Sequence, residues 1–588
     1  MRKTKIVCTL GPACAGLDTL KELIESGMDG ARFNFSHGTH ESHAVMVESL
    51  KRAREETGRP IPMILDTKGP EIRIKTFKEG SVFLEQGQIF TLTARDVEGD
   101  SNIVSVTHAD LPSDLRTGGR VLLDDGLVEL RVKELTNTDI ICEVVNSGAL
   151  SDRKGVNVPD VYVSLPSLTE KDVEDIIFGI KMGFDYIAAS FIRSESDVLK
   201  IRQVLEDNGG ADIKIISKIE SRDGVSNASR ILDVSDGIMV ARGDLGVELA
   251  PEEVPIKQKY LIRIANEKSK PVITATQMLE SMVKNPRPTR AEVNDVANAI
   301  YDGSDAIMLS GETASGAHPV ESVRMMARIA ETTEKNIDYY GEGQSSLKLS
   351  QTHITNTNAI SHATFSIARD LEASCIAAIT SSGFTARMIS KFRPKCPILA
   401  ITPYDMTRRQ LNLTWGCCPV LYNQPFANDK VFEIAVEAAE REGLAKTGDS
   451  VVIAASLPVE GAGTTNALKI QVIGNIFTKG TGFGDKIVHG RANVVRGVNE
   501  EGAYVKEIFE GDILVVTRTN DELIPLIKKA SCVIVGTGGD DEHRHVRTAC
   551  KSLNIPYVIC RENVTDLIPD SIEITVDTAQ GFVYNGKK

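Results

Sequence analysis

The feature that most constrains the fold is an alternation of short β-branched apolar runs with amphipathic helical patterns. The runs are KIVCTL (5–10), ARFNFS (31–36), MILDT (63–67), YIAASF (186–191), KIISKIE (214–220), GIMVARGD (237–244), VITATQM (272–278) and AIMLSGE (306–312). Helical patterns lie between them, and another, PVESVRMMARIAETTEK (319–335), follows the last. Eight strands that alternate with helices predict an α/β protein with a (β/α)8 barrel, and a doubly wound open sheet is the alternative.

The alternation is interrupted once, between about residues 70 and 165, where only strand patterns occur. Examples are SVFLEQGQIFTLTA and RVLLDDGLVELRVKEL, the second with an Asp-Asp-Gly turn. After the polar linker YYGEGQSS (339–346), βα alternation resumes to about residue 473 and returns at the end of the chain. We expect a barrel (1–70 and 165–343), an inserted β domain (71–164), an α/β domain (344–473) and a further α/β domain (474–588).

The composition excludes several classes of function. The chain has 588 residues and a net charge of −14, which argues against non-specific nucleic-acid binding because such binding needs a basic face. The ten cysteines contain no C-x-x-C pair, as is typical of reduced thiols in a cytoplasmic protein. No apolar run approaches the ~18 residues of a membrane span, and the N-terminal run is too short for a signal peptide. We therefore predict a cytoplasmic protein without membrane contact.

Polar side chains gather where the predicted strands end. They are Arg32, Asn34 and Ser36 on the second strand, Asp66, Thr67 and Lys68 on the third, Lys218 and Glu220 on the fifth, Arg242 and Asp244 on the sixth, Thr276 on the seventh, and Ser310 and Glu312 on the eighth. A single one is often just a satisfied structural group, but each costs ~1–3 kcal/mol if it is buried unpaired. Six strand ends with this pattern therefore indicate one shared site at the carboxyl end of the barrel, where barrel enzymes place catalytic groups.

The residue types at these ends indicate phosphate and metal chemistry. Lys218 and Glu220 are two apart on one strand, so both side chains point to the same side. Glu220 and Asp244 lie on neighbouring strands and offer hard oxygen ligands, which favours Mg²⁺ beside a phosphate. The alternative is a simple ion pair between Glu220 and Lys218.

Positive and neutral groups complete the predicted site. Arg32, Arg73, Lys154 and Lys218 supply the positive charge that a multiply anionic, phosphorylated substrate needs in an otherwise acidic chain. Four further residues offer oxygen ligands, and only one of them is charged: Asn34, Ser36, Asp66 and Thr67. Such a set suits a monovalent cation.

Seven motifs occur in the order and spacing of the pyruvate kinase family, which the chain resembles from residue 1 to about 473. They are ARFNFSHGTHESH, LDTKGPEIR, RKGVNVP, IKIISKIESRDGV, MVARGDLGVE, ATQMLESM and LSGETASG. The resemblance implies transfer of the phosphoryl group of phosphoenolpyruvate to ADP, giving pyruvate and ATP in glycolysis. It further implies Mg²⁺ and K⁺ as cofactors, a homotetramer, a phosphorylated allosteric effector (a sugar phosphate or a nucleotide), a lid formed by 71–164, and an effector-binding domain formed by 344–473.

The resemblance also implies a role for each matching residue. Lys218, Arg32 and Thr276 fall at catalytic positions, with Lys218 stabilising the transferring phosphoryl group and the developing enolate. Phosphoenolpyruvate would contact Arg32, Gly243, Asp244 and Thr276; Mg²⁺ would bind Glu220 and Asp244; K⁺ would bind Asn34, Ser36, Asp66 and Thr67. Arg73 and Lys154 fall at nucleotide-phosphate contacts, and Asn34, Ser36 and His37 belong with them to the cofactor-binding set. Glu71 is the residue type of K⁺-dependent members.

Two later segments carry weaker signals. TSSGFTARMISKFRP (380–394) follows a strand and opens a helix, where Ser381, Ser382, Gly383 and Thr385 would cradle a phosphate. An ordinary polar turn is the alternative, and the resemblance implies the effector-phosphate loop. Segment 474–588 resembles the phosphohistidine swivel domain of phosphoenolpyruvate-utilising enzymes. That family has Gly-Gly, two residues, Ser or Thr, and then the phosphorylated histidine.

The histidine motif departs from that pattern. In GGDDEHRH the histidine position is taken by His543 or His545, and Glu542 or Arg544 replaces the hydroxyl residue. We therefore expect a structural or assembly role for 474–588. The residues leave open a dikinase-type phosphotransferase that uses this histidine, a Schiff-base aldolase that uses Lys218, and a sensor without activity. No ATP-grasp-like domain is evident, and the complete barrel motifs favour the kinase.

Overall fold

The computed structural model describes residues 1–588 apart from 162, 340–354, 424–429, 457–464, 475, 497–506, 538–542 and 588. The predicted linker (339–346) therefore lies outside the described residues except for its first residue. The chain divides into two compact units. One contains Met1–Phe365, Ala378–Asn428 and Ala455–Ala467, and the other contains Ser366–Ala377, Asp429–Ala454 and Leu468–Lys588.

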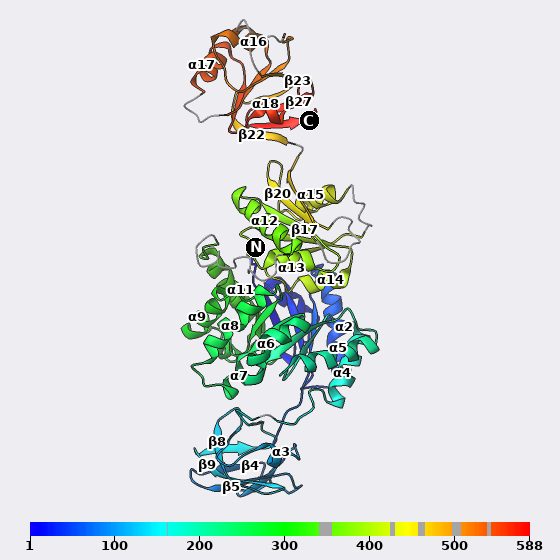
Figure 1. Cartoon of the computed structure of the whole chain (residues 1–588), viewed down its shortest axis with the longest axis vertical. Helices are drawn as coiled ribbons and strands as arrows, with labels where there is room; N and C mark the ends of the chain where they lie inside the picture. Colours follow the sequence, from blue (N-terminus) through cyan, green and yellow to red (C-terminus); the bar gives the residue numbers. More distant parts are fainter. Residues whose placement is uncertain are drawn as a thin grey trace. The chain divides into compact units, whose positions relative to one another are not determined.

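The first eight predicted strands form a closed parallel barrel, so the barrel is confirmed and the open sheet was wrong. Around the barrel the strands follow the order β1-β16-β15-β14-β13-β12-β3-β2. Their bounds are β1 Lys5–Thr9, β2 Gly30–Asn34, β3 Met63–Asp66, β12 Tyr186–Ala189, β13 Lys214–Ile219, β14 Gly237–Ala241, β15 Val272–Ala275 and β16 Ala306–Leu309. The main surrounding helices, most of them labelled in Figure 1, are α1 Leu17–Ser26, α2 His40–Thr57, α4 Glu170–Met182, α5 Glu195–Asp207, α6 Arg222–Val234, α8 Val254–Glu267, α9 Arg290–Tyr301 and α11 Pro319–Lys335.

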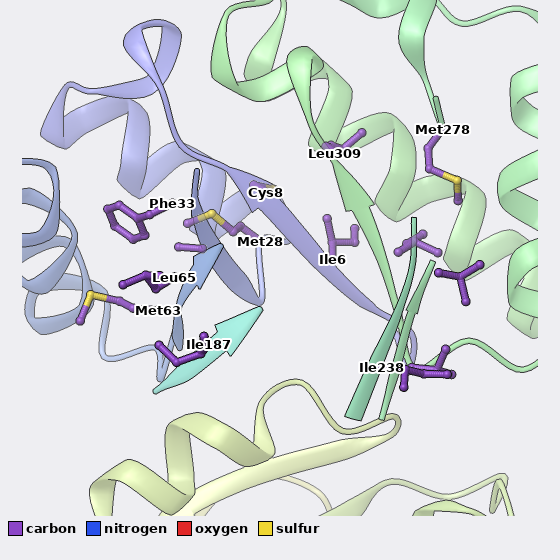
Figure 2. Packing of buried hydrophobic residues seen from close by; sticks show 14 of the residues in the cluster. Ile6, Cys8, Met28, Phe33, Met63, Leu65, Ile187, Ile238, Met278 and Leu309 are labelled. Atoms are coloured by element: carbon purple, nitrogen blue, oxygen red, sulfur yellow. The ribbon is translucent and has the colours of Figure 1, made fainter. Parts of the chain in front are cut away.

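Alternate strand residues face the helices or the barrel interior. Phe33, Leu65 and Ile187 belong to the large apolar cluster between strands and helices, and Figure 2 shows them on neighbouring strands. Ile64 and Ile216 belong instead to the interior cluster. Because strand side chains alternate, Arg32, Asp66 and Lys218 also face the barrel interior. They lie near the carboxyl ends of their strands, which together form the carboxyl rim of the barrel.

The strands are shorter than the sequence patterns suggested. Each predicted run extends one to three residues beyond the observed carboxyl end of its strand. Arg242 and Asp244 were predicted on a strand, but they lie in the short helix α7 (Arg242–Glu248). Glu312 likewise lies in α10 (Gly311–Ala314). The polar residues at the carboxyl end of the barrel thus belong mainly to the turns and short helices that follow the strands.

Four aspartates organise the opposite, amino-terminal end of the barrel. Asp29, Asp185, Asp236 and Asp305 directly precede β2, β12, β14 and β16. In each case the aspartate N–H donates to a carbonyl at the start of the preceding strand, and that residue returns its own N–H to the carboxylate. The four N–O distances are 2.8, 2.8, 2.9 and 3.0 Å, with partners Ile6, Met63, Ile215 and Val272.

Each of these carboxylates also pairs with an arginine, at 2.7 Å for Arg2–Asp29, 2.8 Å for Arg409–Asp185, 2.6 Å for Arg202–Asp236 and 3.0 Å for Arg393–Asp305. A buried carboxylate is stable only if it is hydrogen-bonded and paired, and this arrangement supplies both requirements at four strand starts. This repeat was not predicted, because the polar residues at the carboxyl ends of the strands carried the prediction of the site.

The inserted segment is a β structure with its own apolar core, as predicted. It contains the sheets β10-β4 and β11-β7-β8-β9-β5-β6. The bounds are β4 Ser81–Leu84, β5 Ile89–Thr93, β6 Ile103–Ser105, α3 Leu111–Asp114, β7 Arg120–Leu123, β8 Val128–Leu135, β9 Asp139–Val144, β10 Gly148–Ser151 and β11 Val156–Asn157. Asp124, Asp125 and Gly126 all have positive φ in the predicted turn between β7 and β8.

The later segments also alternate strands and helices. A five-stranded sheet has the order β19-β18-β17-β20-β21, from β17 Cys375–Ile379, β18 Ile398–Thr402, β19 Cys417–Leu421, β20 Ser450–Ala455 and β21 Ala467–Val472. Its helices are α12 Asn356–Asp370, α13 Phe384–Ser390, α14 Asp405–Leu411 and α15 Val431–Arg441. Within the described residues, no helix combines the length and the apolar character that a bilayer crossing requires.

The last segment forms a second closed barrel, in the order β22-β26-β25-β24-β23-β27-β28. The bounds are β22 Ile476–Phe483, β23 Ile487–Val495, β24 Ile513–Val516, α16 Ile524–Lys529, β25 Cys532–Val535, α17 Arg544–Leu553, β26 Tyr557–Cys560, α18 Val564–Leu567, β27 Glu573–Asp577 and β28 Phe582–Asn585. Strands β23, β24, β25 and β26 pair in parallel, so their carboxyl ends share one edge.

Candidate active site

Lys218 is the centre of the polar cluster at the rim of the first barrel. Its Nζ lies 2.8 Å from Ser190 Oγ, 2.9 Å from Glu220 Oε1 and 3.1 Å from Asp66 Oδ1. Burial alone would lower the pKa of Lys218, but the carboxylates of Asp66 and Glu220 outweigh it and raise that pKa above its ordinary value. An imine-forming lysine must lose its proton, so this environment speaks against the aldolase alternative.

Asp66 holds two positive charges together. Its Oδ2 accepts a hydrogen bond of 2.5 Å from Arg32 Nε, while Oδ1 faces Lys218. Arg32 Nη1 also donates to Thr9 Oγ1 at 3.0 Å. Burial tends to raise the pKa of Asp66, but the charges of Arg32 and Lys218 outweigh burial and hold that pKa below its ordinary value. The ionised carboxylate therefore keeps a guanidinium and an ammonium side by side at the mouth of the barrel, as an anion site requires.

Glu220 and Asp244 form a pair of neighbouring carboxylates. Glu220 Oε2 accepts the N–H of Phe191 at 2.5 Å, and Oε1 faces Lys218, so the ion pair that was the alternative interpretation of Glu220 is present. Burial, and next the negative charge of Glu220, raise the pKa of Asp244 to about 7. A divalent cation between the two would relieve this repulsion, so the residues fit Mg²⁺. The described parts of the chain contain no group of three or more His, Cys, Asp or Glu that could hold a metal.

Thr276 occupies a strained turn after β15. Its φ is +70°, in the left-handed region that a β-branched residue rarely adopts. The Thr276 hydroxyl accepts the Gly243 N–H at 2.7 Å and donates to the Ala275 carbonyl at 2.6 Å. Arg242 fixes the turn from the other side: Nη2 donates to the Thr276 carbonyl at 2.6 Å and Nη1 lies 2.7 Å from Asp295 Oδ1. Arg242 therefore serves the turn, although the sequence pattern had placed it with the rim charges.

The proposed potassium ligands come together through strand pairing. Asn34 and Asp66 are directly opposite each other on β2 and β3. Asn34 Oδ1 accepts the Ser36 N–H at 3.1 Å, and Thr67 Oγ1 accepts the Ser190 N–H at 3.1 Å. Ser36 lies in the turn after β2, two residues beyond the strand. A cluster of mostly neutral oxygens with one carboxylate fits a monovalent cation better than a divalent one.

A cavity of about 480 Å³ lies between the inserted β domain and the barrel rim. Its lining includes Asp244, Phe191, Asn157, Glu248 and Arg222. Burial raises the pKa of Glu248 to about 7, although a hydrogen bond with Asn157 partly opposes the rise. Arg222 reaches the inserted domain through a 2.9 Å ion pair with Asp160. Arg222 was not among the predicted site residues, because it lies three residues beyond the end of β13, inside IESRDG.

The two cations predicted for nucleotide phosphates are engaged within the inserted domain. Arg73 Nε and Nη2 lie 2.7 and 2.9 Å from the two carboxylate oxygens of Glu71. Lys154 Nζ lies 2.9 Å from Asp124 Oδ1. Each of the two cations is therefore already paired with a carboxylate, and their contact with a nucleotide stays a prediction.

Comparisons with known proteins agree with this architecture. The barrel domain of pyruvate kinase matches residues 1–323, and the alpha/beta domain of pyruvate kinase matches 358–471. A pyruvate kinase of Sporosarcina psychrophila is 47% identical over 588 residues, covering 100% of this chain and 99% of that protein. The chain belongs to the pyruvate kinase family.

Other relatives give the same result. A pyruvate kinase of Geobacillus stearothermophilus is 46% identical, with 100% of this chain and 99% of that protein covered. The crystal structure of a pyruvate kinase from Cryptosporidium parvum aligns with a TM-score of 0.76 and 40% identity, over 80% of this chain and 96% of that chain. Membership of the pyruvate kinase family makes this protein a phosphotransferase, which is the chemistry that the rim must support.

The mobile domain of PEP-utilising enzymes matches residues 508–581, which confirms the second resemblance. In this domain His543 is buried at the start of α17. His545 lies two residues later, inside α17. Its Nδ1 is 3.0 Å from Thr519 Oγ1, and its Nε2 is 3.1 Å from Asp521 Oδ1. Glu542 lies outside the described residues.

The predicted effector residues follow β17 and lead into α13. Gly383 has φ +78°, where a side chain would be strained. The Ser382 carbonyl accepts from Arg387 Nη1 at 3.1 Å, and the Ser381 carbonyl accepts from Thr407 Oγ1 at 3.1 Å. Thr385 is buried, with its hydroxyl 2.8 Å from that of Thr465. The four residues form a compact polar turn, and the binding of a phosphate there stays a prediction.

Proposed function

We propose that this member of the pyruvate kinase family transfers the phosphoryl group of phosphoenolpyruvate to ADP, giving pyruvate and ATP in glycolysis. The observation that carries the proposal is the buried rim cluster, in which Arg32 and Lys218 share Asp66 beside the crowded carboxylates Glu220 and Asp244. Phosphoryl transfer asks a protein mainly for positioning and electrostatic stabilisation, and this cluster supports both.

The residues of the rim account for the individual steps. Arg32 and Lys218 bind the phosphate group, and Gly243 and Thr276 orient the rest of the substrate. The bond from phosphorus to the enol oxygen breaks while a bond to a terminal oxygen of ADP forms. The enolate that remains carries negative charge, which the Lys218 ammonium stabilises. A proton then adds to the methylene carbon and gives pyruvate. Because the Thr276 hydroxyl donates to Ala275, it must change partner to supply that proton.

Two cations complete the proposed site. Glu220 and Asp244 would hold Mg²⁺, and this ion would supply positive charge against the phosphate groups of the substrates. Asn34, Ser36, Asp66 and Thr67 hold K⁺, and Glu71 is the residue type of members that depend on it. Arg73 and Lys154, with His37, serve the nucleotide, and the inserted domain acts as a lid over the cavity.

We further infer a cytoplasmic homotetramer that a phosphorylated effector regulates through Ser381, Ser382, Gly383 and Thr385. The support for this part is the family resemblance together with the polar turn before α13. We also propose four domains with the predicted boundaries: the barrel (1–70 with 165–343), the inserted domain (71–164), the effector domain (344–473) and the C-terminal domain (474–588).

One coupled assay tests the function. Purified chain, phosphoenolpyruvate and ADP should produce pyruvate only when Mg²⁺ is present, and K⁺ should stimulate the reaction strongly over Na⁺. Absence of pyruvate under all conditions would contradict the proposed reaction. Full activity in a sodium-only buffer would contradict the potassium site alone.

A further inference from the structure

The turn that follows β2 is held by a layer of histidine and phenylalanine side chains from α2 and α4. This turn carries Asn34 and Ser36, two of the residues proposed above for K⁺, and Phe35 lies between them. Phe35 is buried, and its N–H donates to the Asp66 carbonyl on β3 at 3.0 Å. The geometry of the turn therefore depends on what surrounds Phe35.

A buried carboxylate ties the two helices together below the turn. Asp175 on α4 is fully buried, and its Oδ1 lies 2.7 Å from Nε2 of His40, the first residue of α2. Its Oδ2 accepts from Lys171 Nζ at 2.7 Å. Lys171 Nζ also lies 3.5 Å from the Phe35 carbonyl, so this ammonium contacts both the carboxylate and the turn.

Two ring stacks complete the layer. The His40 ring stacks on Phe178 of α4 with centroids 4.3 Å apart, and the His43 ring stacks on Phe35 at 4.1 Å. His43 Nε2 donates to the His37 carbonyl at 2.9 Å, because a carbonyl can only accept. Burial lowers the pKa of His43, which agrees with a neutral ring in this position. The turn is thus fixed at Phe35 and at His37, on either side of Ser36.

We propose that His40, Asp175 and Lys171 are positioning residues for the monovalent cation site. They set the spacing of the Asn34 and Ser36 oxygens through the Phe35 turn, and so they determine how well the site binds K⁺ and rejects Na⁺. These residues act through the Phe35 turn and not through the charged groups of the rim, so the chemistry itself should survive their loss. The inference rests on the potassium site of the proposed function.

The test uses His40→Phe, which keeps the stack on Phe178 but removes the contact with Asp175, and Lys171→Met, which removes the ammonium. Loss of an outer partner of a metal ligand typically weakens binding by 10–100-fold. We expect each variant to need about tenfold more K⁺ for half-maximal activity. Turnover at saturating K⁺ should stay within roughly twofold of the parent, because the transition-state groups are untouched. The matched control is Lys181→Met, an exposed lysine near the other end of α4.

A second readout does not depend on catalysis. Added K⁺ should raise the melting temperature of the parent, since a ligand that binds only the folded state stabilises it. In His40→Phe and Lys171→Met, the rise in melting temperature should need about tenfold more K⁺, as the activity does. In Lys181→Met it should occur at the same K⁺ concentration as in the parent.

Three outcomes would overturn the inference. An unchanged K⁺ requirement in both variants would remove the layer from the cation site. A loss of turnover that is equal at every K⁺ concentration would assign it a general structural role. A parent enzyme that converts phosphoenolpyruvate equally well without K⁺ would overturn both this inference and the potassium site, while leaving the proposed reaction intact.

Discussion

Two aspartates flank strand β14, Asp236 directly before it and Asp244 in the short helix α7 that follows it, and the two have opposite electrostatic environments. Asp236 precedes the strand; burial tends to raise its pKa, but Lys214, the Ile215 N–H and Arg202 outweigh burial and hold that pKa below its ordinary value. Asp244 follows the strand, and burial together with the charge of Glu220 raises its pKa to about 7. The carboxylate of Asp236 is therefore stabilised by its positive neighbours, whereas that of Asp244 lacks enough positive charge around it.

The difference extends to the two rims of the barrel. At the amino end, each of four aspartates has its own arginine and its own strand N–H. At the carboxyl end, Lys218 is shared between Asp66 and Glu220, and Asp244 adds a further carboxylate. The amino rim is arranged for stability, whereas the carboxyl rim leaves negative charge that a bound cation would neutralise.

The largest effect is expected from the lysines of β13. Lys218→Met should fold and bind phosphoenolpyruvate but lose on the order of 10²–10³-fold or more in turnover, because a preorganised charge next to the developing enolate is removed. Lys214→Met is the matched control, since Lys214 lies at the amino end of the same strand, 3.5 Å from Asp236. Steady-state kinetics of both variants measure the difference. Turnover of Lys218→Met within tenfold of the parent would exclude Lys218 from the mechanism.

Neutralising each of the two aspartates that flank β14 should change the stability of the protein in opposite directions. Asp236→Asn should lower the melting temperature of the metal-free protein at pH 8, because Arg202 and Lys214 lose their shared partner. Asp244→Asn should raise it, because a crowded buried charge disappears, while activity is lost with the proposed Mg²⁺ ligand. The expected changes are about 1–3 kcal/mol in opposite directions. Scanning calorimetry in the presence of a chelator measures both, and two shifts of the same sign would contradict the comparison.

The pH dependence of these shifts sharpens the test. A carboxyl whose folded pKa is depressed stabilises the fold above its unfolded pKa, near 3.9, and loses this effect as pH falls through the folded value. The Asp236→Asn difference should therefore be largest above about pH 4 and shrink as the pH falls below it. A carboxyl whose folded pKa is raised costs stability above its unfolded pKa. The gain from Asp244→Asn should accordingly grow between about pH 4 and 7 and level off above it. Melting curves from pH 3 to 9 check both; a gain from Asp244→Asn that is equal at pH 4 and pH 8 would refute the assignment.

Sequence periodicity was sufficient for some of these features and insufficient for others. The two-residue period of a strand placed Lys218 and Glu220 on one side, and the structure confirms this. Asp66 could not be joined to them in advance, because that contact depends on how β3, β12 and β13 pair in the closed barrel.

Other differences have local causes. Arg242 was misplaced because the apolar run GIMVA passes directly into a helix, and periodicity does not mark where a strand stops. The paired states of Arg73 and Lys154 depend on side-chain contacts inside the inserted domain, for which a sequence pattern carries no signal. The aspartate repeat at the amino rim was visible in the sequence as an aspartate directly before each even strand.

The smallest effect on turnover is expected from deletion of residues 474–588. Every residue proposed for the chemistry precedes residue 313, so turnover at saturating substrate should stay within roughly twofold of the full chain. Stability should fall, because the second barrel packs on the segment before it. A Cβ placed on Gly448 would lie 2.3 Å from the Phe582 ring, and Gly448 has φ +90°. The full-length Gly448→Ala variant is therefore the matched control: it disturbs the same contact, and it should lower the melting temperature without changing turnover.

The same deletion decides whether the C-terminal histidines take part in phosphoryl transfer. His545 is hydrogen-bonded to Thr519 and Asp521, and an anionic phosphoryl group at its Nε2 would face the Asp521 carboxylate. Labelled phosphoenolpyruvate should accordingly leave no acid-labile ³²P on the full-length chain. Acid-labile label that disappears in His543→Ala or in His545→Ala would contradict this expectation. It would restore the dikinase-type reaction, and the deletion would then be expected to abolish that exchange while sparing pyruvate formation at the first barrel.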